Sequence, residues 1–359
     1  MKAIRVGLVG TGWGQLQLEA FRRVKGAQVV ALCDADVERL EKLARQYHIA
    51  HTVADYRELL AGDMIDWVCI AAPPEWHRAM AHEAIAAGKH VLCEKPIALN
   101  DWEARDLLAA AQARGIVHAA DYEMRFLPAH AYCKELIDED YLGALHRVDV
   151  TMTMERPWGE HGNWAADAAS GGGVLMELGS HFIDTLRWWF GDVTTVIAGT
   201  RTHFPTVRIP GNKESGNGAG IRKLVTGEDA FWCVMQFARG GEALVNFMTG
   251  ARHDPGWTIG VYGQNGSLVV KSGQLWAKRE GDREMGLLPI PKRLEFEDKP
   301  KDPLMWAMVK LFERQLSAIK QAPEALPFPD FRDDIAVTRI IAAIRRSSVE
   351  RMWVNVGSE

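Results

Sequence analysis

Short apolar runs alternate with longer stretches of helical periodicity over the first 122 residues, and this alternation constrains the fold more than any other feature. The runs are IRVGLVG, VVALCD, IDWVCIAA, HVLCE and IVHAA, and a helical pattern follows each of the first four. Strands that alternate with helices indicate a parallel sheet with helices on both faces. Residues 1–122 are therefore predicted to form a doubly wound domain.

The rest of the chain has a different rhythm. Its strand-like runs are LHRVDVTMTME, TTVIAGTRTHF, AFWCVMQFA, EALVNFMTG, TIGVYG and GSLVVKS, most of them joined by short turns. Short connections favour antiparallel pairing. Helical patterns fall near residues 127–138, 174–190, 304–321 and 333–349. Residues 123–359 are predicted to form an α+β domain with a large, mostly antiparallel open sheet.

Composition narrows the class of protein. A chain of 359 residues is expected to hold two domains, and 47% hydrophobic with 25% charged residues is ordinary for a globular protein. The net charge of -5, with Lys and Arg scattered, gives no footprint for nucleic acid. No stretch approaches 18 uninterrupted apolar residues, so no membrane span and a cytoplasmic location are expected. Five cysteines without CxxC spacing are expected to be reduced core thiols, with no metal site.

A glycine-rich turn follows the first apolar run. In VGLVGTGWGQLQ, Gly10, Gly12 and Gly14 stand between the first strand and the first helix. Glycines at this point allow a tight turn and let backbone N–H groups approach a pyrophosphate at the helix N-terminus. The usual dinucleotide fingerprint has Gly or Ala where this chain has Gln15, which concerns helix-to-strand packing more than the phosphate contact.

An acidic residue at the end of the second run supports a dinucleotide. Asp34 ends VVALCD, where a carboxylate accepts hydrogen bonds from ribose hydroxyls and repels a 2′-phosphate, so NAD is favoured over NADP. Asp34 could instead cap the helix that starts near Asp36. Because S-adenosylmethionine enzymes share a glycine-rich first turn, this half alone does not exclude a methyltransferase. The predicted cofactor-binding residues are Gly10, Gly12, Trp13, Gly14, Asp34, Ala72, Pro73, His77, Glu94 and Lys95. The fold class is α/β, an N-terminal Rossmann doubly wound sheet followed by the α+β domain.

A second candidate site lies on the predicted helix near residues 174–190. Glu177, His181 and Asp184 are spaced by four and three, so on an α-helix they share one face. Two acids beside an imidazole suit general acid/base chemistry. A solvated helix face is the simplest alternative, although Gly171–Gly173 just before it indicates a close backbone approach. A metal site is the third interpretation, but HExxH spacing is absent.

Three ordered motifs carry a family resemblance. AAPPEWH, AAGKHVLCEKP and SGGGVLMELGSHFID occur in this order, with YEMRFLP and YGQNGSL as weaker additions. The chain resembles the glucose-fructose oxidoreductase and inositol dehydrogenase family, Gfo/Idh/MocA, over nearly its whole length. The resemblance implies an NAD- or NADP-dependent oxidoreductase acting on sugars, polyols or cyclitols. It also implies a cis bond between Lys95 and Pro96.

The resemblance assigns roles to four residues. Lys95 matches the lysine of the EKP motif and would hold the substrate hydroxyl and stabilise the developing alkoxide. His181 matches the acid/base histidine. Glu177 stands where the family often has aspartate, and would orient His181 or contact the sugar; Asp184 would support His181 or lie on the helix face. The predicted catalytic residues are Lys95, His181 and Glu177.

Further substrate contacts are predicted more broadly. Besides the catalytic residues, the predicted substrate-binding set contains Tyr122, Arg125, Trp158 and Trp164. Arg125 could equally make a structural ion pair, and the two tryptophans could stack on a sugar ring or build a subunit interface. His77 could line the nicotinamide pocket or only occupy the first turn of a helix.

The expected activity is hydride transfer between nicotinamide and a ring hydroxyl or ketone of a sugar, cyclitol or glycoside. One alternative is an NAD-dependent glycosidase that oxidises the ring transiently, eliminates the glycosidic group and returns the hydride. A second is a sensor that binds NAD without catalysis. Because AFWCVMQFA and EALVNFMTG carry apolar residues on both faces, the sheet is also expected to pair with a copy in a homodimer or homotetramer.

Overall fold

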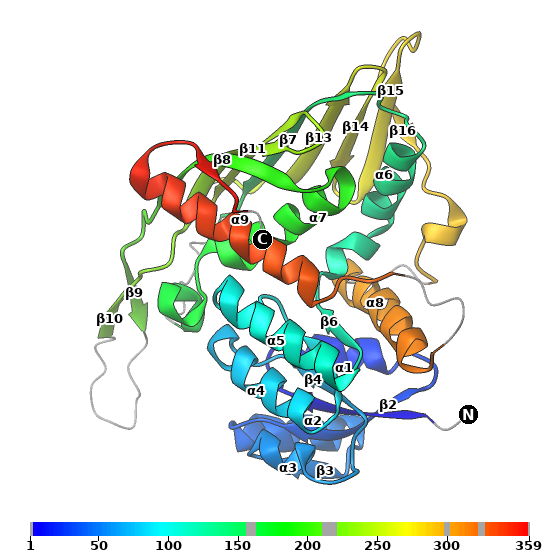
Figure 1. Cartoon of the computed structure of the whole chain (residues 1–359), viewed down its shortest axis with the longest axis vertical. Coiled ribbons are helices and arrows are strands. Elements are labelled where there is room, and N and C mark those ends of the chain that lie inside the picture. The colour runs from blue at the N-terminus through cyan, green and yellow to red at the C-terminus, as the bar shows by residue number, and fades with distance from the viewer. Residues whose placement is uncertain (1–2, 156–162, 210–220, 298–301, 322–326, 358–359) are drawn as a thin grey trace. The chain divides into compact units, whose positions relative to one another are not determined.

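The computed structural model describes residues 3–155, 163–209, 221–297, 302–321 and 327–357. The chain divides into two compact units (Figure 1), each treated separately below. Unit 1 contains residues 1–126 and 296–338, and unit 2 contains residues 127–295 and 339–359. The long helix α9, Phe331–Glu350, begins in unit 1 and ends in unit 2.

Unit 1 is built on a six-stranded parallel sheet with strand order β3-β2-β1-β4-β5-β6. The strands are β1 (Ile4–Val9), β2 (Ala27–Cys33), β3 (His51–Val53), β4 (Trp67–Ile70), β5 (His90–Cys93) and β6 (His118–Ala120). The helices between them are α1 (Gly14–Phe21), α2 (Val37–Tyr47), α3 (Tyr56–Leu60), α4 (Pro74–Ala86) and α5 (Asp101–Arg114). This order is that of a dinucleotide-binding doubly wound fold, whose ligands bind beyond the carboxyl ends of the strands.

The predicted parallel sheet is confirmed, but one of its strands was missed. Strand β3 has three residues, its first two are exposed, and it pairs only with β2 at the sheet edge. A buried strand shows a continuous apolar run because both of its faces are covered, whereas a short edge strand needs no such run. The sequence therefore gives no signal for β3.

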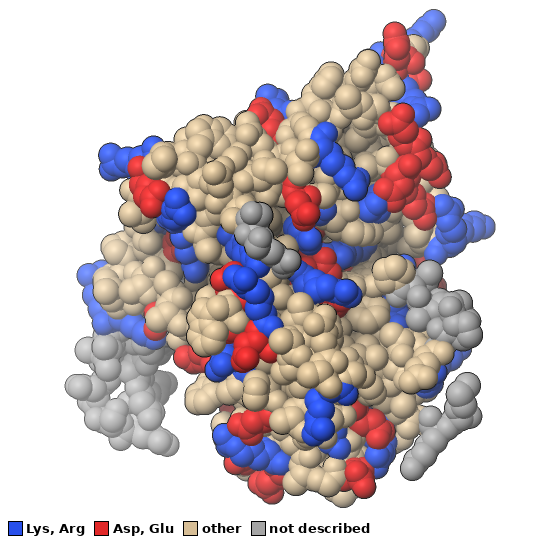
Figure 2. All heavy atoms as spheres, in the orientation of Figure 1, with Lys and Arg blue, Asp and Glu red and all other residues tan. Residues whose placement is uncertain are grey.

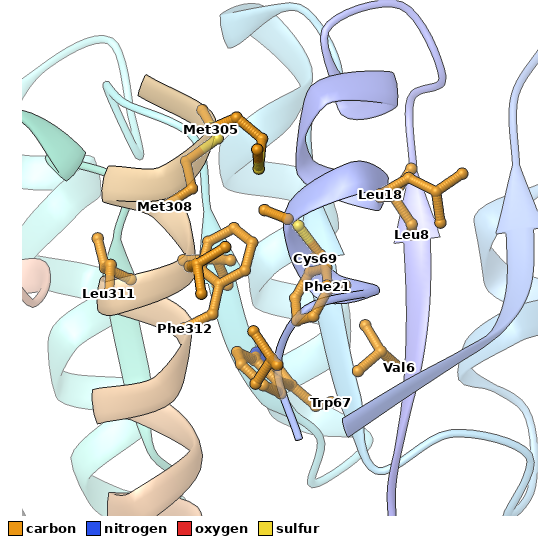
Figure 3. Close-up of a cluster of buried hydrophobic side chains, with 14 of the residues drawn as sticks. Val6, Leu8, Leu18, Phe21, Trp67, Cys69, Met305, Met308, Leu311 and Phe312 are labelled. Atoms are coloured by element: carbon orange, nitrogen blue, oxygen red, sulfur yellow. The ribbon is translucent and has the colours of Figure 1, made fainter. Parts of the chain in front are cut away.

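The helix α8, Pro303–Ile319, packs on the core of unit 1. Met305, Met308 and Phe312 point from α8 toward α1 and the residues around Trp67 (Figure 3). The Phe312 ring stacks on Phe21 with centroids 4.3 Å apart, and Phe21 meets the edge of Trp67 at 5.0 Å. The sequence-based division at residues 122 and 123 differs from this arrangement, since it assigns α8 to the second domain. Periodicity shows that a helix has an apolar face but not which sheet it covers.

Unit 2 is built on a nine-stranded sheet with strand order β16-β15-β14-β13-β7-β12-β11-β8-β17. All of its pairs are antiparallel except that of β7 (Leu145–Thr153) with β12 (Glu242–Met248). The other strands are β8 (Val193–Arg201), β11 (Ala230–Phe237), β13 (Gly256–Gly263), β14 (Gly266–Lys271), β15 (Gln274–Arg279), β16 (Gly286–Leu288) and β17 (Val354–Asn355). A separate hairpin joins β9 (Thr206–Ile209) to β10 (Ile221–Leu224). The large, mostly antiparallel sheet was thus predicted correctly.

One face of this sheet is covered by helices. The helices are α6 (Pro128–Asp138), α7 (Ser180–Phe190) and the second half of α9. On α7, Phe182 meets the edge of Phe247 from β12 at 5.0 Å. The backbone of β8 donates hydrogen bonds to Ser347 and Ser348 of α9. In β11 and β12, alternate residues are buried beneath the helices, while Trp232 and Met248 on the opposite face are exposed.

The distribution of charged residues and the state of the cysteines agree with what the composition predicted. Lys and Arg are interspersed with Asp and Glu on the face shown in Figure 2. Each of the five cysteines is a buried free thiol. Within the described parts of the chain, no helix has both the length and the apolar character needed to cross a membrane.

Replacing Phe312 with alanine tests the assignment of α8 to unit 1. Because the ring packs on Phe21 and Trp67, Phe312→Ala should lower the free energy of unfolding by about 3–5 kcal/mol. Chemical denaturation monitored by circular dichroism measures the change. The control is Lys310→Ala on the same helix, which removes only a partly exposed ion pair with Glu313 and should cost less than about 0.5 kcal/mol. Equal effects of the two substitutions would contradict the assignment.

Candidate active site

The turn from β1 to α1 is shaped for a close backbone approach. Gly10 has φ +89°, and a Cβ on it would lie 2.5 Å from the carbonyl oxygen of Ala71, so only glycine fits. A Cβ on Gly14 would lie 2.8 Å from the Leu8 side chain, so Gly14 allows the close helix-to-strand packing that the fingerprint assigns to position 15. Nothing lies within 4 Å of a Cβ on Gly12, which leaves that side of the turn open.

The start of α1 fits a bound pyrophosphate. Trp13 occupies the N-cap position without a side-chain hydrogen bond that caps the helix, and the first turn contains no acidic residue. The N–H groups of Gln15 and Leu16 bond to the carbonyls of Gly12 and Trp13, so the N–H groups ahead of Gln15 are those that keep the capacity to bind an anion. These observations agree with the predicted dinucleotide turn.

Asp34 is buried at the end of β2 and is held by four donors. Its carboxylate accepts hydrogen bonds from the N–H and the hydroxyl of Thr11, both at 2.6 Å, and from the Asp36 N–H at 2.8 Å. Arg39 donates to both oxygens at 3.0 Å. Burial alone would raise the pKa of Asp34, but the hydrogen bonds outweigh it and lower the pKa, so the group is ionised. The residue that caps α2 is Asp36, not Asp34.

Lys95 follows β5 in a loop whose Lys95–Pro96 peptide bond is cis, as the resemblance implied. The Lys95 residue is 9% exposed. The loop is fixed on both sides, because Glu94 donates its N–H to Ile70 at 2.8 Å and Ile97 donates its N–H to Asp334 at 3.2 Å. Lys95 thus stands at the carboxyl end of a central strand on a well-anchored backbone.

His77 lies in the first turn of α4 and is almost completely buried. Its Nδ1 is 2.6 Å from the Pro96 carbonyl oxygen, and its Nε2 is 2.7 Å from the Ala72 carbonyl oxygen. Burial lowers the pKa of His77, and the nearby Lys95 lowers it further, whereas the two carbonyls raise it. The ring therefore joins the loop after β4 to the loop after β5. Because it is almost completely buried, His77 supports these loops and does not itself line a surface.

Tyr122 and Arg125, predicted to contact substrate, have partners within unit 1. The buried Tyr122 hydroxyl donates to Asp334 at 2.7 Å, and Arg125 forms an ion pair with Asp333 at 2.8 Å. Asp334 also accepts the Ile97 N–H, so it ties the loop after Pro96 to the start of α9. These contacts give both predicted residues a role in holding the loop, and they add no support for a substrate contact.

The glycine run before the second candidate site passes between two loops of unit 2. A Cβ on Gly172 would lie 2.5 Å from the carbonyl oxygens of Trp164 and Ala165, and Gly173 has φ +104°. On the other side, a Cβ on Gly227 would lie 2.8 Å from the Gly173 nitrogen. The close approach predicted from Gly171–Gly173 is thus made to the protein's own backbone. Trp164 opens the short 3-10 helix Trp164–Ala166, and Trp158 lies outside the described residues.

Glu177 and His181 lie at a change of helix type. Residues Leu175–Gly179 form a π-helical turn that leads directly into α7. Glu177 is in the π turn, whereas His181 and Asp184 are in α7, so the predicted single α-helical face is interrupted. Glu177 and His181 are partly exposed and Asp184 is buried. Single π turns inside helices are frequent at functional sites because they alter the direction of a side chain.

A residue that the sequence motifs did not indicate, Glu228, supports this turn. The buried Glu228 accepts the Leu175 N–H at 3.2 Å, and its own carbonyl accepts the Val174 N–H at 2.8 Å. Burial raises the pKa of Glu228, and Arg345, 3.7 Å away, opposes the shift. Glu228 thereby fixes the first turn of the helix that carries Glu177.

The predicted residues fall into two groups. Unit 1 brings together the cofactor set, with the glycine turn, Asp34 and the loops after β4 and β5 at the carboxyl ends of adjacent strands. The Trp13 indole N–H even donates to Glu94 at 2.6 Å. Unit 2 carries Glu177, His181 and Trp164. Among the described residues, no group of three or more His, Cys, Asp or Glu side chains could hold a metal ion.

Comparisons with known proteins agree with this geometry. Residues 4–122 match the model of the oxidoreductase family with an NAD-binding Rossmann fold, GFO_IDH_MocA, and residues 130–269 match the GFO/IDH/MocA C-terminal domain. An uncharacterized oxidoreductase of Synechocystis sp. is 30% identical over 98% of this chain and 96% of its own length. The levoglucosan dehydrogenase of Pseudarthrobacter phenanthrenivorans is 26% identical, with 99% of each chain covered.

A solved structure of levoglucosan dehydrogenase in complex with NADH and levoglucosan has the same fold. It superimposes with a TM-score of 0.86 at 23% identity, covering 99% of this chain and 100% of that one. The fold, the dinucleotide turn and the two family matches lead to one conclusion. The chain belongs to the GFO/IDH/MocA family of oxidoreductases, and its N-terminal part is the NAD-binding Rossmann domain of that family.

Proposed function

We propose that the protein transfers a hydride between NAD and a ring hydroxyl or ketone of a sugar, cyclitol or glycoside. The observation that carries the proposal is the position of Lys95, which follows β5 at the carboxyl edge of the dinucleotide-binding sheet on a loop anchored by His77 and Asp334. Similarity to a levoglucosan dehydrogenase supports a sugar as the substrate class.

The chain's own residues would divide the chemistry between charge stabilisation and proton transfer. The Lys95 ammonium would bind the substrate oxygen and stabilise the negative charge that develops on it during oxidation. His181 would take the hydroxyl proton, and Glu177, four residues earlier in the π turn, would orient the imidazole or contact the sugar. The nicotinamide of bound NAD supplies the hydride acceptor.

Lys95→Ala tests the central role of the lysine. Loss of the ammonium should reduce kcat by about 10²–10³-fold, the usual cost of removing one group that stabilises a developing oxyanion. Reduction of NAD, followed by absorbance over a panel of sugars and cyclitols, measures kcat. The Kd for NAD should change less than threefold. In the control Lys42→Ala, which replaces an exposed lysine of α2, both kcat and the Kd for NAD should change less than threefold. Turnover by Lys95→Ala equal to that of the unaltered protein would refute the proposal.

Asp34 is proposed to select NAD. Its carboxylate would accept hydrogen bonds from the adenosine ribose, while its ion pair with Arg39 neutralises a guanidinium that could otherwise hold a 2′-phosphate. Asp34→Ser should therefore lower kcat/KM for NAD by about 10–100-fold, the worth of a hydrogen bond to a charged group, and should raise kcat/KM for NADP.

The double variant Asp34→Ser/Arg39→Ala separates the two effects. It should lose the gain with NADP and keep the loss with NAD, because only the first depends on the released guanidinium. If Asp34→Ser kept the original preference for NAD, the role of Asp34 would be wrong.

We propose that the exposed face of the nine-stranded sheet is buried against a second copy in a homo-oligomer. Trp232 and Met248 are 48% and 41% exposed on the neighbouring strands β11 and β12 and give this face an apolar surface. Tyr262, two strands beyond β12 on β13, is a further exposed aromatic residue of the sheet. Large exposed apolar patches usually mark interfaces.

A charged substitution on this face should break the oligomer. Sedimentation velocity is expected to show a multiple of 40.0 kDa for the unaltered protein and a 40.0 kDa species for Trp232→Arg. The control is Trp102→Arg, a 58% exposed tryptophan on α5 of unit 1, which should leave the larger species unchanged. If the unaltered protein sedimented as a 40.0 kDa species, the proposed interface would be wrong.

A further inference from the structure

Two buried carboxyl groups lie side by side in unit 1. Glu94 directly follows β5 and Asp121 directly follows β6, and these two strands are paired. Glu94 is 8% exposed and Asp121 is 0% exposed. The two carboxyl groups are close neighbours, because both accept from the same nitrogen, Gln17 Nε2. Two buried carboxylates at such a distance repel strongly unless one of them keeps its proton.

A glutamine amide holds both groups from α1. Gln17 Nε2 donates to Glu94 Oε1 at 2.8 Å and to Asp121 Oδ2 at 2.9 Å. The orientation of this amide is fixed, because the Cys69 thiol donates to Gln17 Oε1 at 2.8 Å. Burial raises the pKa of Cys69 well above its ordinary value, so the thiol remains a donor.

The supply of hydrogen-bond donors differs between the two carboxyls. Glu94 accepts hydrogen bonds from Trp13, from Gln17 and from the Lys95 N–H at 3.2 Å. Asp121 Oδ2 accepts from Gln17, whereas the buried Asp121 Oδ1 receives no donor hydrogen from the described residues. A proton on Asp121 would turn its contact with Glu94 into a hydrogen bond and would satisfy both groups.

We propose that Asp121 is a neutral carboxylic acid whose O–H donates a hydrogen bond to Glu94. Through this bond, Asp121 acts as a positioning residue for Trp13 in the cofactor site. Glu94 Oε1 accepts the Trp13 indole N–H at 2.6 Å, a short bond to an ionised acceptor. The indole lies in the dinucleotide turn between Gly12 and Gly14 and is 49% exposed. Fixed by Glu94, its ring offers a flat apolar wall.

This wall is assigned to the nicotinamide end of NAD. Glu94 holds the indole by its N–H and immediately precedes Lys95, so the ring is fixed beside the loop that carries the proposed reacting group. Flat aromatic faces favour stacking with aromatic rings beyond the effect of the area that they bury. Only this choice of ring rests on the proposed function.

The charges around the pair favour the proton on Asp121. Burial raises the pKa of Asp121 well above its ordinary value, and the neighbouring Glu94 and Glu123 raise it further. Burial also raises the pKa of Glu94, but Lys95 opposes that shift. Because the pKa of Asp121 is raised, the proposed proton is kept to a higher pH than on an ordinary aspartate and is lost as the pH rises through the raised value.

Other titratable groups act on the pair or on its neighbours. The buried thiols of Cys69 and Cys93 face both carboxyls, and burial raises the pKa of each well above its ordinary value. Among the carboxylates, Glu123 acts on Asp121 itself, whereas Asp334 acts on Cys93. Loss of the Asp121 proton therefore leaves two adjacent charges that repel, which should loosen Glu94 and the indole that it holds.

The proton can be detected without cofactor by infrared difference spectroscopy. At neutral pH, the spectrum of the unaltered protein minus that of Asp121→Asn should contain the C=O stretching band of a protonated carboxylic acid. A difference containing only carboxylate bands would overturn the proposal. The matched control is Asp106→Asn, a partly exposed carboxylate of α5 paired with Arg78, which should give carboxylate bands alone.

The positioning role can be read from the Trp13 indole N–H resonance, identified by its loss in Trp13→Phe. In the unaltered protein this resonance should move as the pH rises above neutral. Asp121→Asn should keep the neutral-pH position at every pH, because its amide donates to Glu94 and accepts from Gln17 as the protonated acid does. Asp121→Leu, which can do neither, should displace the resonance at neutral pH. A displaced resonance in Asp121→Asn at neutral pH would contradict the assignment.

Calorimetric binding of NAD completes the test. The Kd should stay within twofold for Asp121→Asn and should rise about five- to tenfold for Asp121→Leu and Trp13→Ala, corresponding to the loss of one stacking contact. An unchanged Kd in Trp13→Ala would refute the proposed stacking of Trp13 on the nicotinamide, even if the infrared band were present. Failure to find a sugar substrate would count against the proposed function only, since none of these measurements uses turnover.

Discussion

Burial of both faces of the parallel sheet is the constraint on which unit 1 depends. Strands β1, β4 and β5 are apolar on both faces, so each face needs a helical layer. Helix α8 supplies part of that layer from about two hundred residues further along the chain, through the stacked rings of Phe312, Phe21 and Trp67. It also bonds to β5 directly, because Gln315 donates to the Val91 carbonyl at 2.7 Å. The strand ends that carry the cofactor residues are therefore set by a core to which both ends of unit 1 contribute.

Buried carboxyl groups then fix the loops that leave these strands. Asp34 accepts hydrogen bonds from the turn after β1 and from the start of α2. Asp334 links the loop after Pro96 to Tyr122 and α9 in the same way. In unit 2, Glu228 does the same for the helix that bears Glu177. In each case the carboxyl is buried and accepts backbone N–H groups, which costs free energy unless the hydrogen bonds are made. Each such group therefore holds its loop in one position, as a site for hydride transfer requires.

Features that depend on residues close together in the sequence could be predicted, whereas those that depend on distant residues could not. Apolar runs and glycine spacing are local, so the two sheets, the dinucleotide turn and the helices near Glu177 and Asp334 could be predicted. Strand β3 could not, because a three-residue edge strand has no apolar run. Nor could the partners of the loops: Asp334 lies 237 residues from Ile97 and Gln17 lies 104 residues from Asp121. The π turn at Leu175–Gly179 depends on hydrogen bonds that residue spacing does not show, so Glu177 and His181 were placed on one regular face.

The proposed proton on Asp121 also bears on the charge that Lys95 can offer a substrate. Glu94 is adjacent to Lys95 in the chain, and a charge on Asp121 would add a second negative group to the same buried cluster. In a medium of low dielectric constant, that second charge would cancel more of the field of the ammonium at the substrate oxygen. A neutral Asp121 supplies the hydrogen bond that orients Glu94 without this cost. In the proposed reaction, the same group would hold the Trp13 indole through Glu94 and would leave the positive charge of Lys95 to stabilise the developing alkoxide.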